Sequence, residues 1–441
     1  MGKKMIRILD FAEVTAEEVF ARSEPTADVS DIVAAIIKDV RENGDEAVIR
    51  YAVKFDGVDP AGFVLELSEE EKSGALRSLD ETDPGLTDIL RKAAANIAGF
   101  CSRQLREGFT MESGPGKITG QKVMPLERAG IYVPGGTAAY PSTVLMDSIP
   151  ALTAGCKEII MTTPPNADGS IEPAVIAAAV IAQETVPGAG SVRIFRTGGA
   201  QAVAALAYGT ESIPAVDKIV GPGNAFVAEA KRQVFGKVAI DMIAGPSEIL
   251  VVSDGKSDPD VVAADMLSQA EHDKNASAVL VTDSAELAQA VAVSIETQLR
   301  SLEREEIARA SIEKNGKIII AADLGQAVDI ANEIAPEHLE LCVDDPFELF
   351  GKVKNAGSVF LGRSCPEALG DYFAGPNHTL PTSGTARFSS PLSVEDFVKT
   401  MQFIHYTDGA LAEVADDIAA LARKEGLTGH ARSVLIRSEK G

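Results

Sequence analysis

Residues 218–234 read Lys-Ile-Val-Gly-Pro-Gly-Asn-Ala-Phe-Val-Ala-Glu-Ala-Lys-Arg-Gln-Val. A short apolar run leads into a turn rich in glycine and proline, and a segment with helical spacing follows it. The same order begins at residues 129–136, 158–165 and 192–199, ahead of segments such as the Ala-rich 174–183. Repetition of strand, turn and helix predicts βαβ units that build a parallel sheet.

A second set of apolar runs lies further along the chain, at residues 248–253, 278–282 and 317–321. Helical segments separate these runs, at about 259–275 and 286–302. The chain is therefore expected to contain two α/β domains.

The ends of the chain have a different pattern. The first 110 residues are expected to be helical, and we expect them to pack on the second set of strands, because the first set resembles a self-contained insert. Residues 382–393 are rich in Ser, Thr, Gly and Pro and are typical of a linker. Residues 394–423 are predicted to be helical.

Composition excludes several classes of function. The 441 residues carry 65 acidic and 41 basic side chains, a net charge of −24. A nucleic-acid partner is not expected, because such binders present a basic face, and an anionic membrane surface is disfavoured too. The longest apolar stretch, 174–182, is too short to span a bilayer. The N-terminal sequence has no apolar signal-peptide core.

The four cysteines are scattered along the chain. No pair has the spacing of metal ligands, which favours reduced thiols and a cytoplasmic location. The cysteines are Cys101, Cys156, Cys342 and Cys365.

The chain has only five histidines, and four of them have ligand-type or acid–base neighbours. Gln269 and His272 lie three residues apart, late in a predicted helix, so both side chains point from one face, as in helical zinc-binding pairs. The alternative is a polar helix end with His near the C-terminal dipole. His405 lies among apolar residues and is expected to be structural.

Glu337 and His338 are adjacent and can act as an acid–base pair, because histidine titrates near neutrality. The alternative is a capped helix start. Asp371 and His378 fall in a loop full of Gly and Pro, where an Asx-type turn is the other interpretation.

Glu425 and His430 follow a predicted helix end near the C-terminus, where a solvated tail is the simpler interpretation. Together, Gln269, His272, Asp371 and His430 make a plausible set of nitrogen and oxygen ligands for zinc. The lack of cysteine ligands favours an open catalytic site over a closed structural one.

Several motifs together resemble the histidinol dehydrogenase family. They occur in the family's order over roughly residues 120–430 and form a specific set. The runs are Glu-Arg-Ala-Gly-Ile-Tyr-Val-Pro-Gly-Gly at 127–136, Val-Gly-Pro-Gly-Asn-Ala-Phe-Val at 220–227, Ala-Gly-Pro-Ser-Glu at 244–248, Ser-Gln-Ala-Glu-His at 268–272, Pro-Glu-His at 336–338, and Gly-Asp-Tyr followed by Gly-Pro-Asn-His-Thr-Leu-Pro within 370–381.

The resemblance implies an activity and its cofactors. The expected reaction is oxidation of L-histidinol to L-histidine through L-histidinal with two NAD⁺, in the last steps of histidine biosynthesis, with one Zn²⁺ per active site.

The resemblance also implies residue roles. Glu337 and His338 match the catalytic pair, and Gln269, His272, Asp371 and His430 match the zinc ligands. The positions that match substrate contacts are Ser247, Gln269, His272, His338, Asp371, His378, Glu425 and His430. The positions that match NAD contacts are Tyr132, Gln201 and Asn224.

The family's fold implies an α/β protein with two incomplete Rossmann-like domains built on parallel sheets, a helical N-terminal segment and a small C-terminal helical tail. Its domains would be an N-terminal arm (1–27), a discontinuous first α/β domain (28–129 and 247–388), a second, NAD-binding α/β domain (130–246) and the tail (389–441). The family also implies a homodimer in which the tail is swapped between subunits, so that His430 enters the partner's site.

No predicted strand is followed by Gly-x-Gly-x-x-Gly, so the usual dinucleotide fingerprint is missing. Gly-rich turns at 134–136, 197–199 and 221–223 are the candidate phosphate contacts, with ordinary strand-ending turns as the alternative.

Three rival functions stay open at this stage. The first is a zinc hydrolase in which Glu337 activates water. The second is an aldehyde dehydrogenase with Cys156 as its nucleophile, beside a lysine that could lower the pKa of the thiol. The third is a metal-dependent structural protein.

Overall fold

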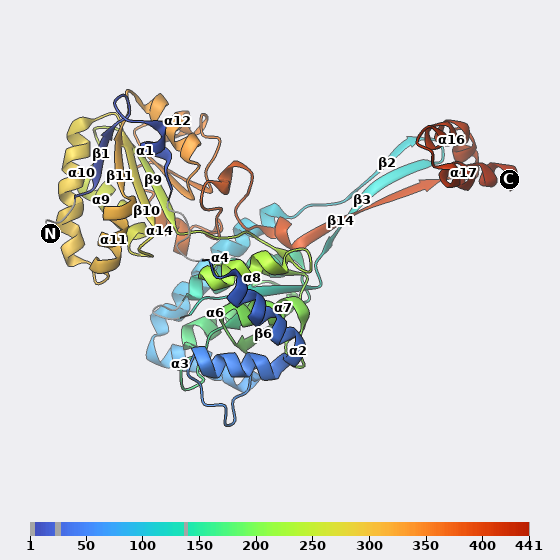
Figure 1. Ribbon diagram of the computed structural model, residues 1–441, viewed down its shortest axis with the longest axis horizontal. Helices are drawn as coiled ribbons and strands as arrows, with labels where there is room; N and C mark the ends of the chain where they lie inside the picture. Colours follow the sequence, from blue (N-terminus) through green and yellow to red (C-terminus); the bar gives the residue numbers. More distant parts are fainter. Residues whose placement is uncertain (1–4, 23–27, 136–139, 441) are drawn as a thin grey trace.

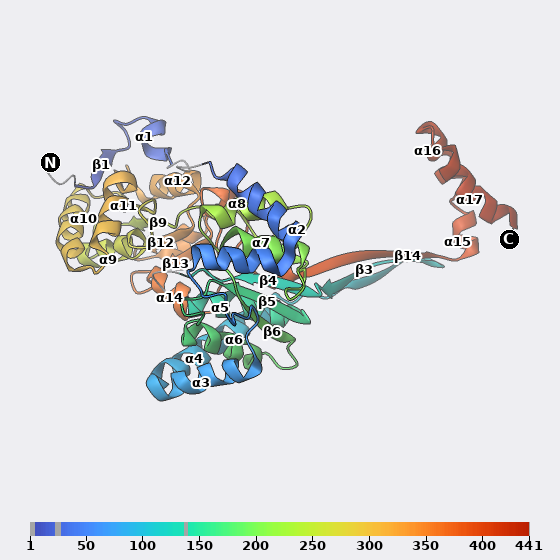
Figure 2. The same ribbon diagram turned by 60° about the horizontal axis from the view of Figure 1, so that its bottom comes forward.

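The computed structural model describes residues 5–22, 28–135 and 140–440. Two α/β domains lie side by side, and a long antiparallel arm projects from them and ends in a small group of helices (Figures 1 and 2). Each domain contains one parallel sheet, and the arm is a third sheet.

The middle of the chain forms a five-stranded parallel sheet, called sheet B here, in the order β6-β5-β4-β7-β8. Numbered along the chain, this order is 3-2-1-4-5, which is the doubly wound Rossmann order without its last strand. The strands are β4 (Arg128–Tyr132), β5 (Glu158–Thr163), β6 (Ser191–Arg196), β7 (Lys218–Val220) and β8 (Ala239–Ile240).

Helices cover both faces of sheet B, and they include the N-terminal helices. One apolar core joins α3 to α6 with one face of the sheet, and another joins α2, α7 and α8 with the other face. The helices are α2 (Ser30–Phe55), α3 (Glu69–Thr82), α4 (Pro84–Cys101), α5 (Pro141–Ala154), α6 (Pro173–Thr185), α7 (Gly199–Tyr208) and α8 (Ala225–Val234).

This packing corrects one expectation. The segment 30–101 was expected to pack on the strands that follow residue 247, within a domain of 28–129 and 247–388, but it packs on the helices that cover sheet B. The helix α2 contacts α7 and α8, and α3 and α4 contact α5 and α6, so these N-terminal helices bury the outer apolar surfaces of that helix layer.

The second set of strands forms a six-stranded parallel sheet, sheet A, in the order β1-β11-β10-β9-β12-β13. Its last five strands repeat the 3-2-1-4-5 order, and β1 adds an edge strand from the N-terminal arm. The strands are β1 (Arg7–Asp10), β9 (Glu248–Ser253), β10 (Ser277–Thr282), β11 (Lys317–Ile320), β12 (His338–Cys342) and β13 (Ser358–Leu361).

Sheet A is also covered on both faces. The helices α9, α10 and α11 pack on one face, and α1 and α12 pack on the other. The helices of this domain are α1 (Ala16–Phe20), α9 (Pro259–Ala270), α10 (Ala285–Gln298), α11 (Glu305–Asn315), α12 (Leu324–Ile334), α13 (Pro346–Phe350) and α14 (Glu367–Tyr372).

The arm is a three-stranded antiparallel sheet in the order β14-β3-β2, and it carries helices at its far end (Figures 1 and 2). The prediction of a helix over 394–423 is wrong for 398–406, which form β14 and pair along their whole length with β3. The arm strands are β2 (Phe109–Gly114), β3 (Lys117–Pro125) and β14 (Val398–Tyr406), and the tip helices are α15 (Asp408–Ala412), α16 (Ala415–Lys424) and α17 (Thr428–Lys440).

The arm exposes apolar side chains in the single chain. Ile404 is 76% exposed and Leu421, in the tip helices, is 69% exposed. His405, expected to be structural, is exposed on the same strand. No helix among the described residues is both long and apolar enough to cross a membrane.

Candidate active site at the facing edges of the two sheets

The predicted catalytic pair lies at the amino-terminal edge of sheet A. Ala335 ends α12 in the left-handed conformation (φ 50°), which turns the chain into Glu337 and the start of β12. The amide of Glu248, the first residue of β9, donates to Glu337 Oε2 at 2.8 Å. The ring Nδ1 of His338 lies 3.0 Å from the carbonyl oxygen of Glu248. One residue of β9 therefore fixes both members of the pair.

The contact with the Glu248 carbonyl determines which ring nitrogen of His338 is free. A carbonyl oxygen only accepts, so Nδ1 carries a proton and donates it. Nε2 is then the atom left for chemistry; it is buried, without a hydrogen-bond partner among the described residues, and faces α14. Burial raises the pKa of Glu337 to about 8. Burial lowers the pKa of His338, whereas the charges of Glu337 and Asp371 raise it, so the protonation of the ring depends on whether these carboxyls are ionised.

Asp371 lies on the short helix α14 and faces the same ring. Its Oδ1 is 3.6 Å from His338 Nε2, and Glu367, one turn earlier, places Oε1 at 3.9 Å from the same nitrogen. The ligand atoms of these three residues lie within 4.8 Å of one another. Interaction with His338 holds the pKa of Asp371 below its usual range despite burial, whereas burial raises that of Glu367 to about 7.

Gln269 lies in the last turn of α9, and His272 follows two residues after the helix ends. Gln269 is fully buried, and both of its amide atoms are without a hydrogen-bond partner among the described residues. The side chain of His272 is exposed, and the group of close ligand atoms around His338 does not include it. A buried polar atom without a partner costs about 1–3 kcal/mol, so these donors fit a bound cation.

His378 connects this edge to the other domain. Its Nδ1 lies 3.0 Å from the carbonyl oxygen of Asp371, and its Nε2 lies 3.4 Å from the hydroxyl of Thr143 in α5. The next residue, Thr379, donates to Asp147 Oδ1 of α5 at 2.8 Å. The loop that carries His378 thus joins the amino-terminal edge of sheet A to sheet B. Ser247, half-buried, immediately precedes β9 at the same edge.

The three positions predicted to contact NAD lie at the carboxyl-terminal edge of sheet B. Tyr132 ends β4, and its hydroxyl accepts from the amide of Gly199 at 3.1 Å. Gln201, buried in the first turn of α7, has an unpartnered Oε1. Asn224 caps α8 after β7, with its side-chain oxygen accepting from two backbone amides. Strand order reverses between β4 and β7, which is where doubly wound sheets bind cofactors.

The Gly-rich turn after β7 needs its first glycine. Gly221 has φ +110°, and a Cβ there would collide with the carbonyl oxygen of Tyr132. Below this turn, Lys231 forms a fully buried ion pair with Asp241, and the Gly221 amide donates to Asp241 Oδ2 at 2.8 Å. The buried Asp241 therefore fixes the position of this turn through the Gly221 amide. Gly136, in the turn after β4, lies outside the described residues.

Two predicted site residues are not brought to this site. Glu425 follows α16 and His430 lies in α17, and both are exposed at the tip of the arm. The arm carries the tip helices away from both domains (Figures 1 and 2). Within one chain, the tip does not complete the cluster around His338.

Sequence reasoning missed Glu367 as part of the cluster. The available signal was its position four residues before Asp371 on a helix, which places both side chains on one face. The aldehyde dehydrogenase alternative loses its nucleophile: Cys156 is 1% exposed, and burial raises the pKa of its thiol to about 12. A thiol of this kind is an inert core residue.

These features define a class of protein: a two-domain α/β enzyme with a cofactor-type edge on one sheet and a histidine–carboxylate cluster on the facing edge of the other. Comparison with known proteins identifies the family. Residues 21–438 match the histidinol dehydrogenase family. The chain belongs to that family, as its motifs indicated, and it is an NAD-dependent oxidoreductase.

Individual relatives agree with this assignment. The chain is 54% identical over 409 residues to histidinol dehydrogenase of Geobacillus kaustophilus, covering 93% of this chain and 94% of the relative. It is 50% identical over 438 residues to the enzyme of Syntrophotalea carbinolica, covering 98% and 99%. The crystal structure of histidinol dehydrogenase from Elizabethkingia anophelis superposes with a TM-score of 0.90 at 35% identity, covering 99% and 98%. The predicted α/β architecture is thereby confirmed.

Asp147, which accepts a hydrogen bond from Thr379 in the His378 loop, should make the free energy of unfolding depend on pH. Burial raises the pKa of its carboxyl to about 8. Between the unfolded pKa of about 4 and this value, the unfolded chain releases the proton more readily, so wild-type stability falls as pH rises. Asp147→Asn keeps the oxygen that accepts from Thr379 but does not titrate.

The stability of Asp147→Asn relative to wild type should therefore rise by about 2 kcal/mol or more between about pH 4 and pH 8. Denaturant unfolding of both proteins at several pH values measures the difference. A difference that stays constant with pH would contradict the assignment.

Proposed function

We propose that this protein oxidises L-histidinol to L-histidine through L-histidinal, with two NAD⁺ and one zinc ion per active site, in the last steps of histidine biosynthesis. The observation that carries the proposal is the set of unpartnered polar atoms around His338, at the edge that faces sheet B. Membership of the family supplies the substrate.

The residues around His338 fit a zinc ion. Gln269, His272 and Asp371 supply an amide oxygen, an imidazole and a carboxylate, which are nitrogen and oxygen donors that zinc accepts. The carboxyls of Glu337 and Glu367, which are buried, and of Asp371, which is half-buried, surround His338, and His378 lies beside Asp371; three carboxyls gathered in this way favour a cation. When bound, zinc would orient the amine and imidazole of the substrate.

His338 is the base for the first oxidation. Its Nδ1–H is held by the carbonyl of Glu248, so Nε2 takes the hydroxyl proton of the substrate as hydride leaves the same carbon for NAD⁺. The product is the aldehyde, and one NADH and one proton are released.

Glu337 acts in the second oxidation. Water adds to the aldehyde carbon, and Glu337 accepts the proton of that water; hydride then leaves for the second NAD⁺, and the carboxylic acid forms. Burial raises the pKa of this carboxyl above its usual range, which makes it a stronger base than an exposed glutamate.

The cofactor would bind at the carboxyl-terminal edge of sheet B, with Tyr132, Gln201 and Asn224 as contacts. The unpartnered Oε1 of Gln201 and the hydroxyl of Thr197 are buried at this edge and can bind ribose or amide groups. The backbone amides after β7 and at the start of α7 can approach a pyrophosphate, which helix N-termini favour.

The homodimer completes the site. The arm exposes apolar side chains on an isolated three-stranded sheet, and such sheets are stabilised by packing. A second copy of the chain covers these surfaces, and its arm places His430 of the partner subunit as the fourth zinc ligand and the partner's Glu425 against the substrate.

Glu337→Gln separates the two oxidations. Alcohol oxidation needs only His338, so NADH formation from histidinol should begin at nearly the wild-type rate and stop after the first oxidation, whereas oxidation of added histidinal should fall by about 10²–10⁴-fold. Stopped-flow absorbance with each substrate measures both. Equal loss of the two oxidations would contradict this division of labour.

Subunit complementation tests the swapped arm. Asp371→Ala and His430→Ala should each be inactive as homodimers. In a mixed dimer, the core of the His430→Ala chain meets an intact arm, so one of its two sites is restored. After unfolding and refolding together in equal amounts, the mixture should recover about a quarter of the wild-type activity. No recovery, with mixed dimers verified by mass spectrometry, would show that the arm serves its own chain.

A further inference from the structure

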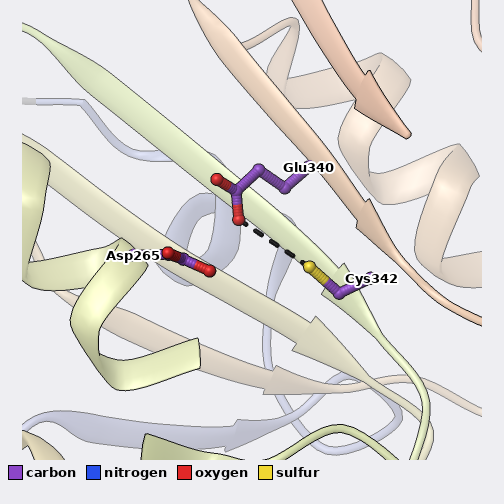
Figure 3. Close-up of side chains that lie close together, drawn as sticks. All are labelled: Asp265, Glu340 and Cys342. Atoms are coloured by element: carbon purple, nitrogen blue, oxygen red, sulfur yellow. Dashed lines mark hydrogen bonds between the residues drawn. The ribbon is translucent and has the colours of Figure 1, made fainter. Parts of the chain in front are cut away.

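A second cluster of titratable side chains lies behind the site, and the proposed function does not use it. Figure 3 shows Asp265 on α9 pointing toward Glu340 and Cys342 of β12. The carboxylate oxygens and the sulfur of these residues lie within 4.8 Å of one another. Glu340 and Cys342 are buried. Among the residues that the structure describes, neither the carboxyl of Asp265 nor that of Glu340 forms an ion pair with a basic side chain.

The strand explains why this cluster adjoins the catalytic pair. Side chains alternate along β12, so His338, Glu340 and Cys342 share the face toward α9, while Leu339 and Leu341 enter the opposite core. Glu340 therefore lies directly beyond His338 on the same face.

Every polar atom of Glu340 has a partner. Its Oε1 accepts from the backbone amide of Glu367 at 2.7 Å, and its Oε2 lies 3.8 Å from the Cys342 sulfur. The carboxyl of the half-buried Asp265 lies within 4.8 Å of that of Glu340. Burial and the charge of Asp265 raise the pKa of Glu340, because two carboxylates this close repel each other.

The bond to the Glu367 amide has a structural consequence. Glu367 is the first residue of α14, and the residue before it, Pro366, offers no side-chain cap. The first amides of a helix need acceptors, and Glu340 supplies one from a neighbouring strand. It thus fixes the start of the helix that carries Glu367 and Asp371.

Asp265 extends the same connection to α9. It lies one turn before Gln269, on the helix that also leads to His272. Ser268 of α9 donates to Glu367 Oε2 at 3.1 Å, a second tie between α9 and α14. The Asp265–Glu340 pair therefore joins the three elements that carry the predicted zinc ligands and the catalytic pair.

We propose that Glu340, supported by Asp265, is a positioning residue for the zinc site: it caps α14 and holds Asp371 at the distance from Gln269 that the metal requires. This inference rests on the proposed zinc site. Outer-shell partners of this kind typically contribute 10–100-fold to metal affinity.

The test measures zinc affinity and stability separately. Purified full-length protein is stripped with chelator, and its zinc dissociation constant is determined by competition with a chromophoric chelator. Thermal unfolding of the metal-free protein is recorded in parallel. The variants are Glu340→Ala, Glu340→Gln, Asp265→Ala and the matched control Cys342→Ala, which alters the same cluster without touching α14.

Glu340→Ala should weaken zinc binding by about 10–100-fold. Glu340→Gln retains an oxygen for the Glu367 amide and a donor for Asp265, so its affinity should stay close to wild type. Cys342→Ala should lower thermal stability without changing zinc affinity. Asp265→Ala should weaken zinc by less than Glu340→Ala, and it decides the question if Glu340→Ala does not fold.

The outcomes distinguish this inference from the proposed function. Wild-type zinc affinity in both Glu340→Ala and Asp265→Ala, with stability lowered as in Cys342→Ala, would overturn the positioning role and leave the zinc site intact. A wild-type protein that binds no zinc would overturn both.

Discussion

The active site depends on the pairing of β9 with β12. Parallel register sets His338 opposite Ile249, which brings the main chain of Glu248 against the catalytic pair. The amide of Glu248 donates to Glu337 and its carbonyl oxygen accepts from His338, so the main chain of a single residue orients Glu337 and fixes which ring nitrogen of His338 carries the proton. A slip of one residue would turn His338 into the opposite core, because side chains alternate along a strand.

The two sheets use opposite edges. Sheet B presents the carboxyl ends of its strands, as doubly wound cofactor domains do, whereas sheet A presents the amino ends of β9 and β12 together with the C-terminus of α9. Cofactor and reacting groups can therefore meet between two domains of the same strand order. The loop around His378 lies between the two domains. Its contacts with Thr143 and Asp147 of α5 hold the amino-terminal edge of sheet A close to the carboxyl-terminal edge of sheet B.

Much of the architecture follows from local sequence. Apolar runs that end in Gly-rich turns predicted both parallel sheets, because that pattern reports strand, turn and helix directly. The partners of an amphipathic helix are not encoded locally, which is why 30–101 was assigned to the wrong sheet. The strand 398–406 is predicted wrongly as a helix because its stabilising partner, β3, lies about 280 residues earlier in the chain.

In the site, too, local sequence predicts some residues, whereas others depend on contacts between distant parts of the chain. Adjacent pairs such as Glu337–His338, and Gln269 with His272 one helical turn apart, could be found from spacing, and the family motifs supplied their roles. Glu340 could not be found in this way, because isolated acidic residues are common in a chain with 65 of them, and the spacing of Glu367 from Asp371 was the one available signal for Glu367. The fold brings Glu340 behind His338 and Glu367 beside it, where the hydrogen bond of Glu340 to the Glu367 amide and the unpartnered Oε1 of Glu367 reveal them.

We propose that zinc-dependent, NAD-linked oxidation of histidinol takes place at the facing edges of the two sheets. The most direct measurement is NADH formation at saturating NAD⁺ with limiting L-histidinol, before and after removal of zinc by a chelator. The account predicts two NADH for each histidinol, lost on chelation and restored by Zn²⁺. Full NADH yield that is indifferent to chelation, or no NADH from histidinol by zinc-loaded protein, would contradict it.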